Sequence, residues 1–255
     1  MEAEPPKAEP PKRKRRWFQF SLRTLLIFTA VVAVACGCLG KKIERKRRER
    51  EAVKAIDALG GIVWYGFQYT GDNSPPDSNA TPPGPYWLRN LFGENLFDEV
   101  AAVSFCANLT VTDVGLVHLK ALPELQVLNL GHCHVTDAGL EHLKGLTQLQ
   151  RLALGLTDVT DAGLVHLKGL TQLRYLGLQG TSVADAGLVD LKGLSQLQTL
   201  DLRNTDVTDA GLEYIKSLIQ LQIVDLRYSK VTDDGVKDLQ KALPNCKIEH
   251  EESSR

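Results

Sequence analysis

One motif repeats along this chain at a fixed interval of 24 residues. The stretch VTDAGL or a close variant of it begins at six positions, namely Val111, Val135, Val159, Val183, Val207 and Val231. Each copy carries an Asp at its third position: Asp113, Asp137, Asp161, Asp185, Asp209 and Asp233. A regular period of roughly 20 to 50 residues predicts a solenoid, because one short unit cannot bury its apolar side chains without a stacked neighbour.

Each unit also carries the apolar pattern L-x-x-L-x-L. Two successive copies are Leu149, Leu152, Leu154 and Leu173, Leu176, Leu178. We expect each inward leucine to contribute about 1.5 to 3 kcal/mol on burial. A small polar residue follows each pattern three positions later, at Cys133, Thr157, Thr181, Thr205 and Ser229. These side chains are predicted to satisfy loop backbone groups inside the coil, since buried polar groups need partners.

The recurrent Asp is predicted to be structural and not catalytic. In VTDAGLEHLKGL, Thr136 or Asp137 stands where a short helix begins, and the apolar spacing continues from Leu140. Thr and Asp accept hydrogen bonds from the free amides of a helix start, and Asp also suits the positive end of the helix dipole. The Asp column is therefore interpreted as a set of helix caps.

The repeats resemble the leucine-rich repeat family, and in particular its cysteine-containing class, which also occurs in F-box adaptors. The resemblance covers about 150 residues, from 99 to 249. It implies an α/β fold, a leucine-rich repeat solenoid with a parallel β-sheet on the concave face and short helices on the convex face. No F-box-like region precedes the repeats in this sequence.

The N-terminal segment differs in character from the repeats. Between Arg23 and Lys41 lie 17 residues without a charge, and basic clusters flank both ends. This composition predicts a transmembrane helix within 17–40, and we expect 1–16 to be a disordered basic tail. A cleaved signal peptide ending at the AVA of 33–35, or a lipid on Cys36, is an alternative. The uncleaved anchor is favoured because dense positive charge from Lys41 onward would hinder export.

A second resemblance rests on FQFSLRTLL, GGIVWY and PPGPYWLRNLFGENLFDEVAAVSF. These stretches are similar to those of bacterial single-pass membrane-anchored leucine-rich repeat proteins, in which this region closes the N-terminal end of the solenoid. The resemblance implies an extracytoplasmic repeat domain on the cell membrane. The Lys and Arg count slightly favours the opposite orientation, so a cytoplasm-facing adaptor stays open.

The remaining chain is divided by composition. Residues 41–59 are predicted to form a charged helix that stops at Gly60-Gly61 and carries the apolar stripe Val53, Ile56 and Leu59. Residues 60–98 are predicted to form an irregular cap region, with a strand in 62–69, a Pro-rich loop at 70–85 and a short helix at 86–93. The repeat domain spans 99–249, with a first strand through Val100 and a last edge strand near 246–249, and 250–255 form a charged tail.

The concave face is the predicted binding surface, because solenoids use this face to bind partners. The candidate contact residues are Arg151, Tyr175, Gln179, Asp201, Arg203, Asp225, Arg227 and Tyr228, and Leu156 and Asn204 lie beside them. Aromatic, Arg and Asp side chains together are typical of protein interfaces, although a merely solvated sheet is the alternative. Charge reversal at Arg203 and Arg227 is expected to abolish partner capture and to leave thermal unfolding nearly unchanged.

Other functions find little support in the sequence. No Gly-rich phosphate loop, nucleophile elbow or paired carboxylates are present, so we predict no catalysis and no cofactor. The candidate metal ligands His132, Cys133 and His134, and the column His118, His142 and His166, are interpreted as structural or solvated. Basic runs are confined to about the first 50 residues, which argues against nucleic-acid binding. We therefore expect a membrane-tethered module that binds a protein or peptide, with an enzyme site in 60–98 as the rival.

Overall fold

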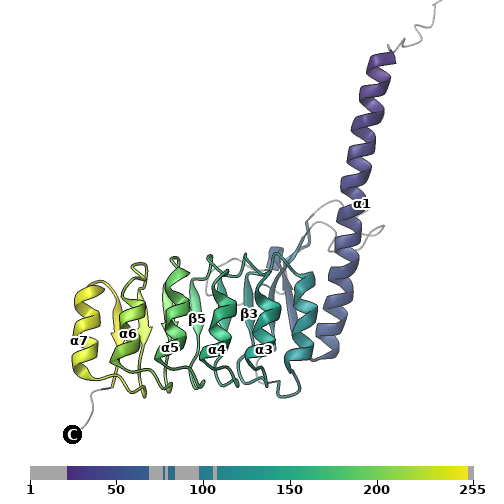
Figure 1. Ribbon diagram of the computed structural model, residues 1–255. Coiled ribbons are helices and arrows are strands. Elements are labelled where there is room, and N and C mark those ends of the chain that lie inside the picture. Colours follow the sequence, from purple (N-terminus) through teal and green to yellow (C-terminus); the bar gives the residue numbers. More distant parts are fainter. Residues whose placement is uncertain (1–21, 69–76, 78–79, 84–97, 106–107, 252–255) are drawn as a thin grey trace, which may run out of the picture. The chain divides into compact units, whose positions relative to one another are not determined.

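The computed structural model describes residues 22–68, 77, 80–83, 98–105 and 108–251 (Figure 1). The chain forms two compact units, residues 1–44 and residues 45–255. The predicted helix at 86–93, most of the Pro-rich loop and Cys106 lie outside the described residues.

The second unit is built on one eight-stranded sheet whose strands follow chain order. The strands are β1 (Ile62–Tyr65), β2 (Val100–Ser104), β3 (Val127–Asn129), β4 (Arg151–Ala153), β5 (Tyr175–Gly177), β6 (Thr199–Asp201), β7 (Ile223–Asp225) and β8 (Lys247–Glu249). β1 pairs antiparallel with β2, and every later pair is parallel with a constant register of 24 residues from β3 to β8. The predicted parallel sheet, its first strand and its last edge strand are confirmed.

Short helices cover the other side of the sheet. They are η2 (Asp113–Ala121), α3 (Asp137–Leu140), η3 (Glu141–Leu143), α4 (Asp161–Leu164), η4 (Val165–Leu167), α5 (Asp185–Leu188), η5 (Val189–Gly193), α6 (Asp209–Ile215) and α7 (Asp233–Ala242). Figure 1 shows α3 to α7 side by side in one row, with the strands behind them. One helix and one strand per unit is the arrangement that the repeat pattern predicted.

The core lies between these two layers. The leucines of the repeat are almost completely buried, and Leu152, Leu176 and Leu200 each expose 0% of their surface. The small polar position is satisfied as expected, since the Thr157 hydroxyl donates to the Leu154 carbonyl at 2.6 Å and the Cys133 thiol reaches the Phe105 carbonyl at 3.4 Å. Thr181, Thr205 and Ser229 repeat the hydroxyl contact at 2.6–2.7 Å.

The Asp column has a structural role, but of the two predicted capping residues the threonine is confirmed and the aspartate is wrong. Thr136 is the capping residue, because its side chain accepts a hydrogen bond from the Ala138 amide at 3.3 Å. The carboxylate of Asp113, from the preceding unit, accepts both the Thr136 amide at 2.8 Å and the Thr136 hydroxyl at 2.7 Å. Each Asp stands one residue inside its own helix, so its side chain bonds to the next unit instead of its own helix start.

The same contact returns along the stack. Asp137, Asp185 and Asp209 accept both hydrogen bonds from the Thr of the following unit. A glycine sits two residues after each Asp, and a Cβ on Gly163 would collide with the Asp137 carboxylate. The VTDAGL motif therefore forms a row of hydrogen bonds that joins each unit to the next.

The last part of helix α1 (Leu22–Ala58) packs against the first repeat. Ile56 is fully buried in the common core, and Val53 and Leu59 are partly buried against it, which confirms the predicted apolar stripe. The helix ends where Gly60 adopts a φ of +73°. The Asn108 side-chain amide donates to the Leu59 carbonyl at 2.6 Å and satisfies this helix end.

Two of the charged residues of 41–59 are buried. The side chains of Lys46 and Glu49 are only 3% and 5% exposed. The Lys46 ammonium lies 3.0 Å from Glu49 and 2.8 Å from Glu99. Tertiary packing buries this group because the helix closes the end of the solenoid, and the paired charges lower the penalty of leaving water.

Burial shifts the acidity of this cluster. The pKa of Glu49 is raised to about 7, first by burial and then by its hydrogen bond with Glu99. For Glu99, burial acts to raise the pKa, but hydrogen bonds from Glu49 and Lys46 outweigh it and the pKa is lowered. The two carboxyl groups therefore share one proton and one ammonium group.

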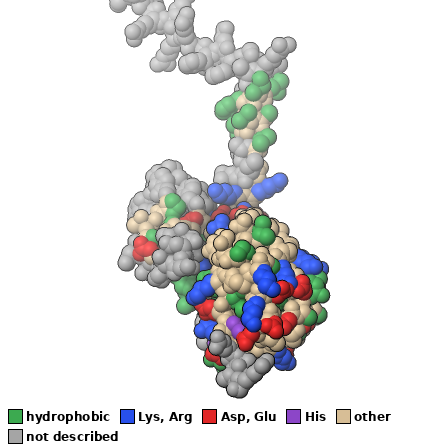
Figure 2. Space-filling model, turned by 90° about the vertical axis from the view of Figure 1, so that its left-hand side faces the viewer, with side chains coloured by type: hydrophobic (Ala, Val, Ile, Leu, Met, Phe, Trp, Pro, Cys, Tyr) green, Lys and Arg blue, Asp and Glu red, His purple; other side chains and the backbone are tan. Residues whose placement is uncertain are grey.

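The C-terminal end of the stack carries a polar cover. Figure 2 shows Lys and Arg intermingled with Asp and Glu on this end, with hydrophobic side chains only scattered among them. Asp233 belongs to the last VTDAGL variant, and the imidazole of His250 lies 3.4 Å from its carboxylate. Charged and polar side chains therefore cover this end of the stack, which is typical of solenoid ends.

The first unit contains the start of α1. Several of its apolar side chains are exposed, including Ile27 and Phe28 at 64% and 65%. Within the part of the chain that the structure describes, no helix has both the length and the apolar character needed to cross a membrane.

Candidate functional site

The parallel register places two columns of side chains on the exposed face of the sheet. One column contains Val127, Arg151, Tyr175, Thr199, Ile223 and Lys247, and the other contains Asn129, Ala153, Gly177, Asp201, Asp225 and Glu249. The predicted outward positions are therefore confirmed. Between them run the fully buried middle residues Leu128, Leu152, Leu176, Leu200 and Val224.

Arg151 and Tyr175 form a pair on neighbouring strands. The Arg151 guanidinium carbon lies 4.7 Å from the centroid of the Tyr175 ring, which is a cation–π arrangement. Burial is the largest cause that raises the pKa of the Tyr175 phenol, and the Asp201 carboxylate adds to it. The pair presents a flat aromatic and cationic surface in the middle of the sheet.

Arg203 and Arg227 are held by carboxylates of their own chain. Arg203 contacts Asp201 through two nitrogens at 2.9 Å and 2.7 Å, and its Nε lies 3.3 Å from Asp225. Arg227 lies 2.5 Å from Asp225 and 3.1 Å from Glu249. Burial acts to raise the pKa of Asp225, but the hydrogen bonds from Arg227 lower it overall.

This network changes what we expect of the arginine variant. Asp201 and Asp225 are 6% and 8% exposed, so both carboxylates depend on the two arginines for compensation. Charge reversal at Arg203 and Arg227 would set four acidic groups against one another. We therefore expect such a variant to lose stability, where the sequence led us to expect nearly unchanged unfolding.

A hollow lies beside the strand ends, and we call it the rim hollow. It has a volume of about 330 Å³ and is lined by Leu156, Gln179, Gly180, Arg203, Asn204 and Tyr228. Four of these residues occupy the same position in successive units and have a positive φ: Leu156 at 56°, Gly180 at 66°, Asn204 at 51° and Tyr228 at 60°. The structure therefore brings Gln179, Arg203 and Tyr228 together, and adds Leu156 and Asn204.

The side chain of Gln179 lies over two glycines. A Cβ on Gly155 would collide with its amide, and a Cβ on Gly177 would lie 3.0 Å from its Oε1. The Oε1 atom is buried and accepts no hydrogen bond from the described residues. A buried acceptor without a donor is unfavourable by about 1 to 3 kcal/mol.

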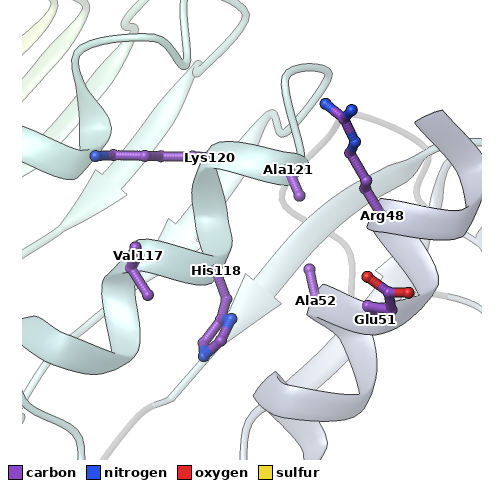
Figure 3. Close-up of a pocket in the computed structure, with 7 residues that line it drawn as sticks. All are labelled: Arg48, Glu51, Ala52, Val117, His118, Lys120 and Ala121. Atoms are coloured by element: carbon purple, nitrogen blue, oxygen red, sulfur yellow. The ribbon is translucent and has the colours of Figure 1, made fainter. Parts of the chain in front are cut away.

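A second hollow of about 460 Å³ lies between the end of α1 and η2 (Figure 3). Its basic residues are Arg48, His118 and Lys120, and Glu51 is its one acid. Figure 3 shows that the side chains of Arg48 and Lys120 extend in different directions and do not converge on one point. This geometry does not form an anion site.

The described histidines and cysteines do not gather into a metal centre. Cys133 is buried and its neighbours His132 and His134 are exposed, so the three side chains do not meet at one point. His142 and His166 are half-buried instead of fully solvated, because their neighbours on the helical side cover them. Across the described ranges, no group of three or more His, Cys, Asp or Glu could hold a metal ion, and the described cysteines Cys133 and Cys246 are free and buried.

Two segments of the chain, residues 121–144 and 194–216, match the family model described as Leucine Rich repeat. Each segment covers one strand and the helix that follows it, namely β3 with α3 and η3, and β6 with α6. In these segments the chain is similar to leucine-rich repeats. The constant 24-residue register and the buried leucine columns agree with this similarity.

Two solved structures of bacterial proteins show partial similarity to the chain. An internalin from Listeria monocytogenes strain 4b F2365 is 25% identical over 55% of this chain and 38% of its own, with a TM-score of 0.47. Internalin C2 of the same strain is 23% identical over 60% of this chain and 81% of its own, with a TM-score of 0.42. The chain thus spans well under half the length of the first of them. No curated protein sequence matches the chain.

Sequence reasoning placed Leu156 and Asn204 beside the candidate residues but did not single them out. A usable signal was present, because the position of Leu156 and Tyr228 is held by Gly180 and Asn204 in the units between them. Gly and Asn tolerate positive φ, whereas a large side chain at that position is unusual.

Proposed function

We propose that this leucine-rich repeat protein is a non-catalytic interaction module that binds a protein or peptide on the exposed face of its sheet. The observation that carries the proposal is the combination of the Arg151–Tyr175 pair and the rim hollow on one continuous surface. Aromatic and Arg side chains are enriched in protein interfaces, and solenoids offer such extended surfaces for binding.

A selection experiment tests this proposal. A random-peptide library displayed on phage is selected on the immobilised full chain, and the enriched peptides are measured by calorimetry. Tyr175→Ala is expected to weaken their binding by about tenfold or more, as truncation of an interface hot spot does. Ile219→Ser is the control, because Ile219 is 78% exposed and lies in a turn before β7, away from this face. Equal binding to both variants would contradict the proposal.

The proposal includes attachment to the cell membrane through residues 17–40, with the repeats outside the cytoplasm. Its support is the 17-residue stretch without charge and the resemblance of the N-terminal region. Alkaline phosphatase fused after Arg255 is expected to be active in intact cells. An inactive but well-expressed fusion would place the repeats in the cytoplasm and favour an adaptor at the inner membrane surface.

A further inference from the structure

Two large side chains in the rim hollow stand where the backbone disfavours them. Leu156 and Tyr228 have φ values of 56° and 60°, in the left-handed region that excludes most residues with a branched or bulky side chain. The equivalent positions of the two units between them hold Gly180 and Asn204, residue types that adopt this conformation readily, and the unit before Leu156 holds His132 at 61°.

Packing does not explain these two residues. Leu156 is 47% exposed and Tyr228 is 67% exposed, so each leaves much of its apolar surface in water. At both positions the backbone conformation is unfavourable and the side chain leaves much of its apolar surface exposed. These two residues therefore contribute little to the stability of the folded chain. Such residues gather at binding sites, where a ligand supplies the missing burial.

The charges around the hollow restrict what can enter it. Arg203 is the charged residue among those that line it. Its guanidinium is engaged with Asp201 at 2.7 Å and with Asp225 at 3.3 Å, and Arg227 is engaged with Asp225 at 2.5 Å and with Glu249 at 3.1 Å. An acidic ligand group would therefore compete with carboxylates of the chain itself for these guanidinium groups.

The polar group that the hollow does offer is an acceptor. The Oε1 of Gln179 is buried and has no donor among the described residues. A ligand that brings an N–H group to this oxygen removes the penalty of a buried, unpaired acceptor. Peptide backbone amides and basic side chains carry such donors beside apolar side chains, which matches the apolar walls of the hollow.

We propose that the rim hollow is the subsite that receives an apolar side chain of a bound peptide, with a peptide N–H group donating to Gln179. This inference rests on the proposed function and names the part of the surface, and the ligand chemistry, on which recognition depends. The preferred peptide carries an apolar residue next to a neutral or basic group and not next to an acidic one.

The test uses the full chain and the phage-displayed random-peptide library described above. The enriched peptides are expected to share an apolar residue without an acidic neighbour. Leu156→Asn and Tyr228→Asn install the residue that Asn204 supplies in this column, and each is expected to weaken peptide binding about tenfold or more. Both variants should melt at the wild-type temperature or up to about 4 °C above it, because the strained position is relieved.

Two variants of Gln179 test the acceptor separately. Gln179→Glu keeps an acceptor oxygen and should retain peptide binding, whereas Gln179→Leu removes it and should weaken binding about tenfold. Peptides that bind all these variants equally, yet lose binding to Tyr175→Ala, would show that the rim hollow is not the peptide subsite. They would leave the proposed function intact. A library that yields no binder would count against both proposals.

Two further results would overturn the inference. Melting more than about 5 °C below the wild type for the Asn variants would mean that Leu156 and Tyr228 serve packing and not recognition. Binding of a glycan array in place of peptides, abolished by Tyr228→Asn, would assign the hollow to a carbohydrate.

Discussion

Ala184 interrupts a row of threonines on the helical side of the solenoid. Thr136, Thr160 and Thr208 occupy the equivalent position in other units, and each binds the Asp of the preceding unit through both its amide and its hydroxyl. Ala184 supplies only its amide, which donates to Asp161 at 2.7 Å. Its φ and ψ are −127° and −164°, close to −121° and −175° at Thr160, so a Thr fits there without backbone movement.

The substitution Ala184→Thr should therefore stabilise the protein by two hydrogen bonds. The helix that begins at Asp185 gains a side-chain cap on the Ala186 amide, and a Thr cap is worth about 1 kcal/mol over Ala. The new hydroxyl also donates a hydrogen bond to the second carboxylate oxygen of Asp161. This charge-assisted hydrogen bond contributes about 1 kcal/mol, because the site is partly exposed. The sum of about 2 kcal/mol corresponds to a rise in Tm of about 4 to 8 °C for a domain of this size.

Thermal unfolding of the full chain, followed by circular dichroism, measures this rise. Ala184→Val is the matched control, because Val has the shape of Thr without its hydroxyl and should give little of the gain. Adding Asp161→Asn to Ala184→Thr should remove about half of the gain. A rise as large with Val as with Thr would refute the reasoning, since packing and not hydrogen bonding would then be responsible.

Three other outcomes follow from the buried groups. The pKa of Glu49, raised to about 7 from an ordinary 4.5, gives stability that is complete below 4.5 and lost as pH rises through about 7. Glu99, whose pKa is lowered, stabilises the fold at pH values above its ordinary pKa. This contribution is lost as the pH falls through the pKa of Glu99 in the folded protein. Amide protection factors at the N-terminal end, from hydrogen exchange corrected for the intrinsic exchange rate at each pH, should thus be highest near pH 4.5 and should fall as the pH rises toward about 7. Glu49→Gln should remove this fall. Leu176→Ala should lower the free energy of unfolding in urea by about 2 to 5 kcal/mol, because Leu176 is fully buried. Reversing Arg203 and Arg227 to Glu together should lower Tm by several degrees, while Lys230→Glu, a charge that is 65% exposed in the side chain, should change it little.

The sequence predicted the parts of this fold that depend on periodicity. A 24-residue repeat of leucines can bury its apolar side chains only by stacking, so the parallel sheet, the register and the inward columns followed directly. The column of small polar residues at Cys133, Thr157, Thr181, Thr205 and Ser229 was predictable for the same reason, because a buried loop carbonyl requires a donor in every unit. The outward candidates from Arg151 to Tyr228 also followed from the alternation of side chains along a strand.

The sequence did not show which groups pair with one another. Asp137 was expected to cap its own helix, but it bonds to Thr160, 23 residues later, because stacking brings the next unit nearer than its own first turn. Arg203 was expected to be available to a partner, and it is instead held by Asp201 and Asp225.

Local pattern alone therefore determined that this chain forms a leucine-rich repeat solenoid, because the burial of leucines is a property of each unit repeated along the chain. Tertiary structure decided how its charges are compensated and where its surface is hollowed. Both depend on distances between different units, as the burial of Lys46 against Glu99 and the position of Tyr228 beside Gln179 illustrate. Electrostatic and hydrogen-bond energies change steeply with such distances, so these features arise only when the units are stacked.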